Sequence, residues 1–128
     1  MYIKIGPYRK NRAFHIHIDN YDVWNLDRTL AAIIHPALIL LKKTKQGYPE
    51  LWEDGMHAEY DGQQAFDFFD YDVQNKYLEH KWDAVMDSMI NAFGMILSDE
   101  FADWTSEERD QIDEGLAFFG KYYFSLWD

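Results

Sequence analysis

The sequence predicts a mainly α-helical α+β fold with a three-helix core, a small N-terminal two-stranded β-element and a long irregular segment rich in acidic and aromatic residues. Two C-terminal stretches place apolar residues three and four positions apart, which is the spacing of a buried helix face. The first twenty residues instead contain short runs that are typical of strands. The chain has 128 residues, of which 48% are hydrophobic, so we expect one domain, residues 1–128, with a sizeable apolar core.

The β-element is predicted within residues 1–20. Residues 2–5 end at a Gly-Pro pair, and residues 14–19 alternate strictly between apolar and polar side chains. Because successive side chains of a strand point to opposite faces, the second strand should have one apolar face, which is buried, and one polar face. The apolar face would carry Phe14, Ile16 and Ile18, and the polar face His15, His17 and Asp19.

A central helix is predicted over residues 25–46. Asn25 is a suitable N-cap, and Gly47 followed by Pro49 is a typical signal for the end of a helix. The middle of this stretch, residues 30–41, is apolar on nearly every face. A helix of that kind should lie at the centre of the fold, covered on several sides.

The rest of the chain is predicted to contain the irregular segment and two further helices. Residues 48–72 carry eight acidic residues and no Lys or Arg, and they show no lasting helical period. Periodic apolar residues predict a second helix over 73–97 and a third over 105–127. Thr105 and Glu108 form a capping-box pattern at the start of the third helix.

Charge is divided unevenly along the chain. Residues 1–46 have a net charge of +5 and residues 47–128 a net charge of −16. The total of −11 argues against direct binding of nucleic acid. The absence of cysteine excludes a disulfide scaffold, a thiol nucleophile and a thiolate zinc site. No apolar run is long enough to span a bilayer and no signal peptide is visible, so we expect a soluble intracellular protein with no membrane partner.

The strong sequence signatures of enzymes are missing. There is no Gly-rich phosphate loop, no His-Glu-x-x-His pair and no Gly-x-Ser-x-Gly elbow. We therefore expect no catalytic residue, no cofactor and no metal, in a protein that is not an enzyme. A metal-dependent enzyme is the alternative, and it would use one of two sets of side chains. These sets are His15, His17 and Asp19 on the strand, and Glu79, Asp83 and Asp87 on the second helix. A solvent-facing strand and a solvated helix face explain them more simply.

Basic and aromatic side chains form the candidate binding set. Lys121 lies within an aromatic run from Phe118 to Tyr123. A lysine flanked by rings suits a flat anionic ligand, because a ring can stack while the cation meets a phosphate. The alternative is that the rings belong to the core and the lysine extends to solvent. The predicted ligand-binding residues are Arg9, Lys10, Trp24, Arg28, Lys42, Lys45, Lys121 and Tyr122.

Longer motifs carry a family resemblance over roughly half of the chain. They are YDxWxxDxTLAxIIxPxL with LKxTKxGxP (residues 21–49), WDxVxDxMIxAF (82–93) and GLxxFGKYYxxLWD (115–128), with Lys4–Tyr8 near the start. Through them the chain resembles a short version of a group of uncharacterised proteins encoded by tailed bacteriophages. Arg28 stands where similar proteins have histidine. The group has no assigned activity, so the resemblance implies a phage setting and no mechanism.

Together these observations predict a phage accessory protein of the counter-defence type that is not an enzyme. It would bind and sequester a small anionic nucleotide-like signal in the cytoplasm of the host cell. One alternative is an acidic inhibitor that mimics nucleic acid and occupies a host nuclease or other defence protein. Another is a virion or assembly component. The excess of aromatic residues over what a small core needs predicts a homo-oligomer.

Overall fold

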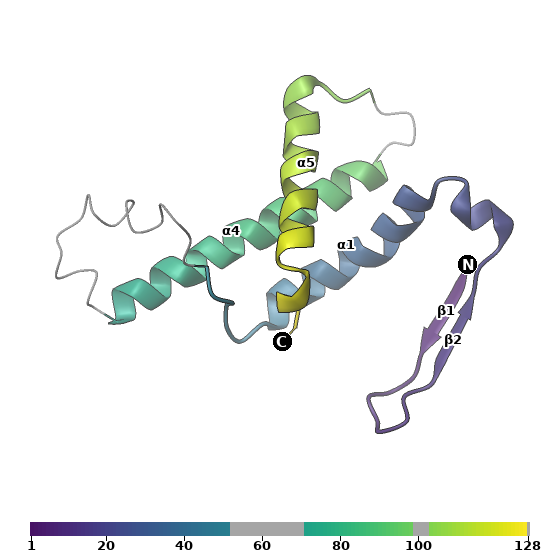
Figure 1. Cartoon of the computed structure of the whole chain (residues 1–128), viewed down its shortest axis with the longest axis horizontal. Helices are drawn as coiled ribbons and strands as arrows, with labels where there is room; N and C mark the ends of the chain where they lie inside the picture. Colours follow the sequence, from purple (N-terminus) through teal and green to yellow (C-terminus); the bar gives the residue numbers. More distant parts are fainter. Residues whose placement is uncertain (52–70, 99–102, 128) are drawn as a thin grey trace.

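A computed structural model describes residues 1–51, 71–98 and 103–127 (Figure 1). Three helices and a two-stranded antiparallel sheet within these residues confirm the predicted fold class. Residues 52–70, most of the predicted irregular segment, lie outside the described residues, and Asp72 already belongs to a helix. The elements are β1 (Tyr2–Ile5), β2 (Phe14–His17), the 3₁₀ turn η1 (Asn20–Val23), α1 (Leu26–Thr44), α4 (Tyr71–Ser98), α5 (Ser106–Lys121) and the 3₁₀ turn η2 (Tyr123–Ser125).

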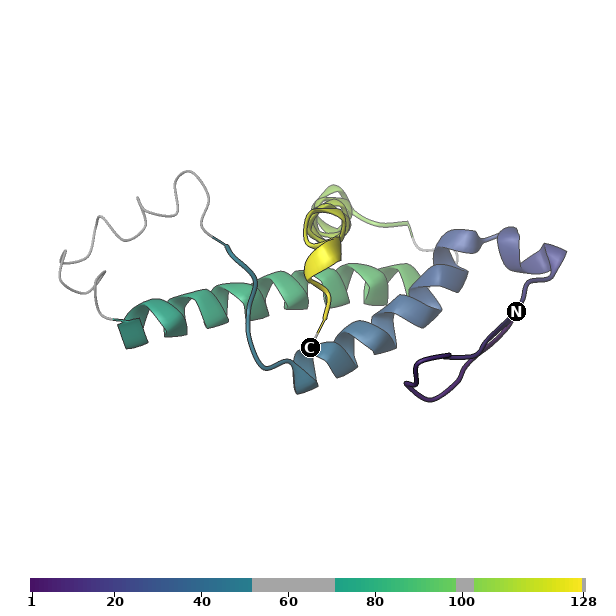
Figure 2. The same ribbon diagram turned by 60° about the horizontal axis from the view of Figure 1, so that its bottom comes forward.

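The N-terminal arm, residues 1–24, is a β-hairpin joined to α1 by η1. β1 pairs antiparallel with β2 in a register that places Ile3 opposite Ile16 and Ile5 opposite Phe14. The hairpin stands apart from the helices in both views (Figures 1 and 2). All eight strand residues are exposed, so the predicted alternation holds but the expected burial of its apolar face is wrong.

The centre of the fold is α4, because this helix packs against α1 and also against α5 (Figure 2). Within the described residues α4 is the one α-helix that α1 packs against. Only Ala31 and Leu38 of α1 are fully buried. The expectation that the helix over 25–46 is the central one is therefore wrong. A strongly apolar sequence shows that a helix needs cover, but it cannot show whether its own chain provides that cover. The fully buried apolar residues of α4 are Leu78, Trp82, Val85, Met86, Met89, Ala92, Phe93 and Ile96.

Small residues allow the helices to approach closely. A Cβ atom built on Gly115 of α5 would lie 2.5 Å from the carbonyl oxygen of Ser88 and would also meet the Cβ of Ala92, both on α4. A Cβ atom built on Gly94 of α4 would lie 3.0 Å from Nε2 of His35 on α1. The two helix contacts that build the core therefore each pass through a glycine.

The predicted start of α5 is confirmed. The Thr105 hydroxyl accepts a hydrogen bond from the Glu108 N–H at 3.1 Å, and the Glu108 carboxylate accepts one from the Thr105 N–H at 3.2 Å. The helix ends at Lys121, earlier than the predicted boundary at 127. The chain then turns through η2, which brings its last described residues toward the end of α1.

Candidate functional site

The predicted ligand-binding residues do not form one cluster. Arg9 and Lys10 are exposed on the loop between β1 and β2, and Trp24 is 78% exposed at the base of the arm. Arg28 and Lys42 lie near opposite ends of α1, about 21 Å apart along the axis at 1.5 Å per residue. One small ligand cannot contact all of these side chains in a single protomer.

Arg28 supports the end of a neighbouring helix. Its Nη2 atom donates a hydrogen bond to the carbonyl oxygen of Leu97 at 3.1 Å. Leu97 lies in the last turn of α4, where backbone carbonyls have no partner within the helix. The Nη1 atom of Arg28 is buried and has no hydrogen-bond partner in the described part of the chain.

Lys42 and Lys45 bind carboxylates of α4. Lys45 Nζ lies 2.8 Å from Asp83 Oδ1, and Lys42 pairs with Asp87 in the same way. The hydrogen bond to Asp87 raises the pKa of Lys42 above its ordinary value of 10.5. Asp83 and Asp87 therefore connect α4 to α1, which corrects the expectation of a merely solvated face.

A pocket of about 330 Å³ opens where the C-terminal residues pass the end of α1. Figures 1 and 2 both show the C-terminus beside this end of the helix. The volume is within the range of small-molecule sites, roughly 300–1,000 Å³. The pocket is lined by Gln46, Gly47, Tyr48, Pro49, Trp82, Ser125 and Trp127.

Two of its aromatic walls are held in place. Trp82 is only 3% exposed, and the Tyr122 ring packs edge-on against it at a centroid distance of 5.5 Å. The Tyr48 hydroxyl donates a hydrogen bond to the side-chain oxygen of Asn75 on α4. The third ring, Trp127, is 74% exposed. The pocket thus has two fixed rings and one accessible ring.

The described side chains that line the pocket carry no formal charge. Tyr48 and Trp127 offer aromatic surface and Trp82 only its small exposed part, while the Gln46 amide and the Ser125 hydroxyl can each donate and accept hydrogen bonds. This combination suits a planar heterocycle with polar groups at its edge. Among the lining residues that the structure describes there is no pair of acid and base, and the groups they present are suited to binding.

The predicted pair Lys121 and Tyr122 lies next to this pocket but does not line it. Lys121 Nζ is 5.4 Å from the centroid of the Tyr122 ring, and that ring packs edge-on against Trp82. Sequence reasoning predicted none of the residues that line this pocket, Tyr48, Trp82 and Trp127 included. The Gly47–Pro49 stretch indicates the end of a helix. Tyr and Trp residues gather in the sequence near that end, and this was the signal that could have pointed to a ring-binding site.

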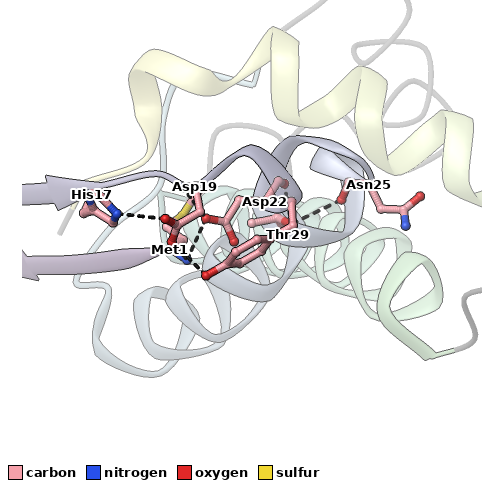
Figure 3. A network of polar contacts seen from close by, with 7 residues as sticks. Met1, His17, Asp19, Asp22, Asn25 and Thr29 are labelled. Atoms are coloured by element: carbon pink, nitrogen blue, oxygen red, sulfur yellow. Dashed lines mark hydrogen bonds and ion pairs between the residues drawn. The ribbon is translucent and has the colours of Figure 1, made fainter.

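Polar contacts hold the base of the arm (Figure 3). The N-terminal ammonium of Met1 lies 2.6 Å from Asp22 Oδ2 and 3.7 Å from Asp19 Oδ2. Thr29 of α1 donates a hydrogen bond from its hydroxyl to the Asp22 carbonyl oxygen at 3.0 Å. The first residue of the hairpin is thereby connected to the first turns of α1.

Asp19 extends this network. It accepts a hydrogen bond from the Tyr21 hydroxyl at 2.9 Å and contacts His17 Nε2 at 2.9 Å. The Tyr21 hydrogen bond, followed by that of His17, lowers the pKa of Asp19. The ammonium lowers the pKa of Asp22, and the Asp22 carboxylate in turn raises the pKa of the ammonium.

The network should be complete near neutral pH and should weaken at both extremes. Because the pKa of Asp22 is lowered, its ion pair with the ammonium stabilises the folded state fully above pH 3.8, the ordinary pKa of aspartate. This stabilisation is lost as the pH falls through the lowered pKa. Because the pKa of the ammonium is raised, the same ion pair stabilises the folded state fully below pH 8.0, the ordinary pKa of an N-terminal ammonium. This stabilisation is lost as the pH rises through the raised pKa. NMR chemical shifts of β1 and η1 amides, followed against pH, measure this. Asp22→Asn should weaken both transitions, and transitions of unchanged size in that variant would contradict the assignment.

The remaining candidates bring no further site. Within residues 1–51, 71–98 and 103–127, no group of three or more His, Asp or Glu side chains is placed to hold a metal ion. His17, from the proposed strand set, contacts Asp19 as described above. No helix in the described part of the chain is long and apolar enough to cross a membrane.

Comparison with known proteins identifies no relative: a scan against protein-family models finds no match, and searches of curated proteins and of solved structures find no similar protein. Function is therefore inferred from the chain's own geometry, since a fold by itself does not define an activity.

Proposed function

We propose that this is a non-enzymatic binding protein whose pocket takes the planar ring of a nucleotide-like molecule. One observation carries the proposal: Tyr48, Trp82 and Trp127 surround a volume of about 330 Å³, together with the uncharged polar groups of Gln46 and Ser125. Stacking on aromatic side chains contributes about 1–3 kcal/mol per nucleobase. The edge of the ring would exchange hydrogen bonds with the amide and the hydroxyl.

Nearby cations support an anionic ligand. Lys45 directly precedes Gln46 of the lining, and Lys121 lies over Tyr122, which supports Trp82. Lys121 is the candidate for attracting a phosphate, because its ammonium lies over the Tyr122 ring that packs against Trp82 of the lining. The ring should supply most of the affinity, with charge adding a preference for nucleotides over nucleosides.

The setting completes the proposal. The phage-like motifs support a counter-defence role, in which the protein sequesters a host signal in the host cytoplasm, and the exposed apolar arm supports a homo-oligomer. The acidic inhibitor is the second candidate. It is favoured by a stripe of exposed acids on α5, formed by Glu107, Asp110 and Glu114 at helical spacing.

Ring binding is expected to depend on Trp127 and not on Trp24. Purified protein would be titrated with adenosine, guanosine, cytidine and uridine, their 5′-monophosphates, cyclic dinucleotides and ADP-ribose, followed by tryptophan fluorescence and native mass spectrometry. Trp127→Ala removes the accessible ring and should weaken binding of the best ligand about tenfold or more. Trp24→Ala is the matched control, because this side chain is equally exposed but lies outside the pocket.

Two further results decide the proposal. Lys121→Ala should reduce the preference for the nucleotide while leaving the nucleoside affinity nearly unchanged. Equal affinities of the Trp127→Ala and Trp24→Ala variants, or no binding across the whole panel, would overturn ring binding. If no ligand of the panel binds, the acidic inhibitor becomes the better explanation.

A further inference from the structure

The hairpin presents an uncovered apolar face. Ile3, Ile5, Phe14 and Ile16 are directly opposite one another in the register, so their side chains share one side of the sheet. Their exposed fractions are 39%, 46%, 60% and 58%. The hairpin contacts no helix within the described residues. A two-stranded hairpin is marginally stable at best by itself, so this face needs cover.

α1 presents a second apolar stripe, which no other element among the described residues covers. Leu26, Leu30, Ile33 and Leu40 recur at helical spacing and are 40–61% exposed. Ala31 and Leu38, which are almost fully buried, belong to the side of α1 that faces the core. The exposed stripe and the hairpin face are therefore two separate apolar surfaces in one chain.

The base of the arm keeps these two surfaces apart. Met1 is tied to Asp22, and Thr29 of α1 is hydrogen-bonded to the Asp22 carbonyl. These contacts hold the base of the arm on the start of α1, and the hairpin stands apart from α1 in Figure 1, with no contact between them among the described residues. A second copy of the chain has the same hairpin face and the same α1 stripe exposed. The hairpin of each copy can therefore cover the α1 stripe of the other.

The available area is sufficient for such a pair. A large apolar side chain has on the order of 150–200 Å² to lose when it is fully covered. Eight such side chains at about half exposure offer roughly 700 Å² per protomer, close to the ~800 Å² per partner of a standard interface. A reciprocal contact also limits the assembly to two copies. Each copy uses its hairpin face and its α1 stripe once, so neither surface is left to bind a third copy.

We propose that two copies of this chain exchange arms: the apolar face of each hairpin packs on the exposed α1 stripe of the other copy. This inference rests on the proposed homo-oligomer and is independent of the ring-binding pocket. It identifies both halves of the interface and makes a dimer with twofold symmetry the assembled state.

Mass measurements by light scattering and analytical ultracentrifugation test the assembly. The unmodified protein should be a dimer, and Ile16→Asp or Leu30→Asp should each give a monomer with unchanged helical circular dichroism. Leu40→Asp, at the most exposed position of the stripe, replaces Leu30→Asp if the latter loses helix content. His15→Asp is the matched control on the polar face of the same strand and should remain dimeric. Mixing the Ile16→Asp and Leu30→Asp variants should restore part of the dimer, because one intact arm-to-helix contact is regained.

Cysteine pairs define the contact, because the natural chain has no cysteine. Mixed Ile16→Cys and Leu30→Cys chains, one of them labelled with ¹⁵N, should form mainly the mixed disulfide dimer. Efficient homodimer formation by Ile16→Cys alone would show packing of hairpin on hairpin, which overturns arm exchange but retains the homo-oligomer. A double variant linked within one chain would show that the arm covers its own helix. A monomer at all concentrations would overturn both proposals.

Discussion

Gly115→Ala is expected to destabilise the protein by about 3 kcal/mol, near the upper end of the effects of overpacking a core. The new Cβ atom would lie 2.5 Å from the carbonyl oxygen of Ser88 and would overlap the Cβ of Ala92. Neither neighbour can move aside, since one is helix backbone and the other is a fully buried residue of α4. The helices must separate, and the contacts around Ile112 would loosen. Urea unfolding followed by circular dichroism measures the loss.

Gly120→Ala is the matched control in the same helix. A Cβ atom at this position would meet no atom within 4 Å, so only the gain in helix propensity remains. That gain is at most about 1 kcal/mol. The two substitutions should therefore have opposite signs. A stable Gly115→Ala variant would show that α5 does not cross α4 at this residue.

Trp82→Ala is expected to cost roughly 3–5 kcal/mol, the usual range for removing a buried tryptophan. The side chain is 3% exposed and packs edge-on against Tyr122. Its loss leaves a cavity between α4 and the end of α5, and it also removes a wall of the pocket. Because small domains have a total stability of only about 5–15 kcal/mol, this variant should unfold at much lower urea concentration.

Trp24→Ala provides the comparison for this effect as well, since the Trp24 side chain is 78% exposed. It should change the free energy of unfolding by less than about 0.5 kcal/mol. All variants should be compared at one protein concentration, because self-association makes apparent stability depend on it. A cost below about 1 kcal/mol for Trp82→Ala would contradict the burial of this residue and its role as a fixed wall.

Several parts of the structure follow from local sequence patterns. The capping box at Thr105 and Glu108 marks the start of α5, and the apolar residues of α4 recur at the predicted spacing. The strand over 14–17 follows from its alternation. These features are predictable because caps and periodicity depend on residues within a few positions of one another.

Other features depend on which segments meet. Local sequence could not reveal that Asp83 pairs with Lys45, that Gly115 lies against Ser88, or that Trp127 approaches Tyr48. Arg28 illustrates the same limit, because its carbonyl partner on Leu97 is 69 positions away in the chain.

The sequence by itself determined the helices, the strands, the charge asymmetry and the excess of apolar surface, because each is a property of composition or of near neighbours. Only the tertiary structure decided that α4 is the central helix, that the predicted cations separate and that a ring-lined pocket forms at the end of α1. It also decided that the arm and α1 keep apolar faces uncovered. The physical reason is that an apolar pattern shows that a face must be covered, whereas its partner is selected by packing between residues far apart in the chain.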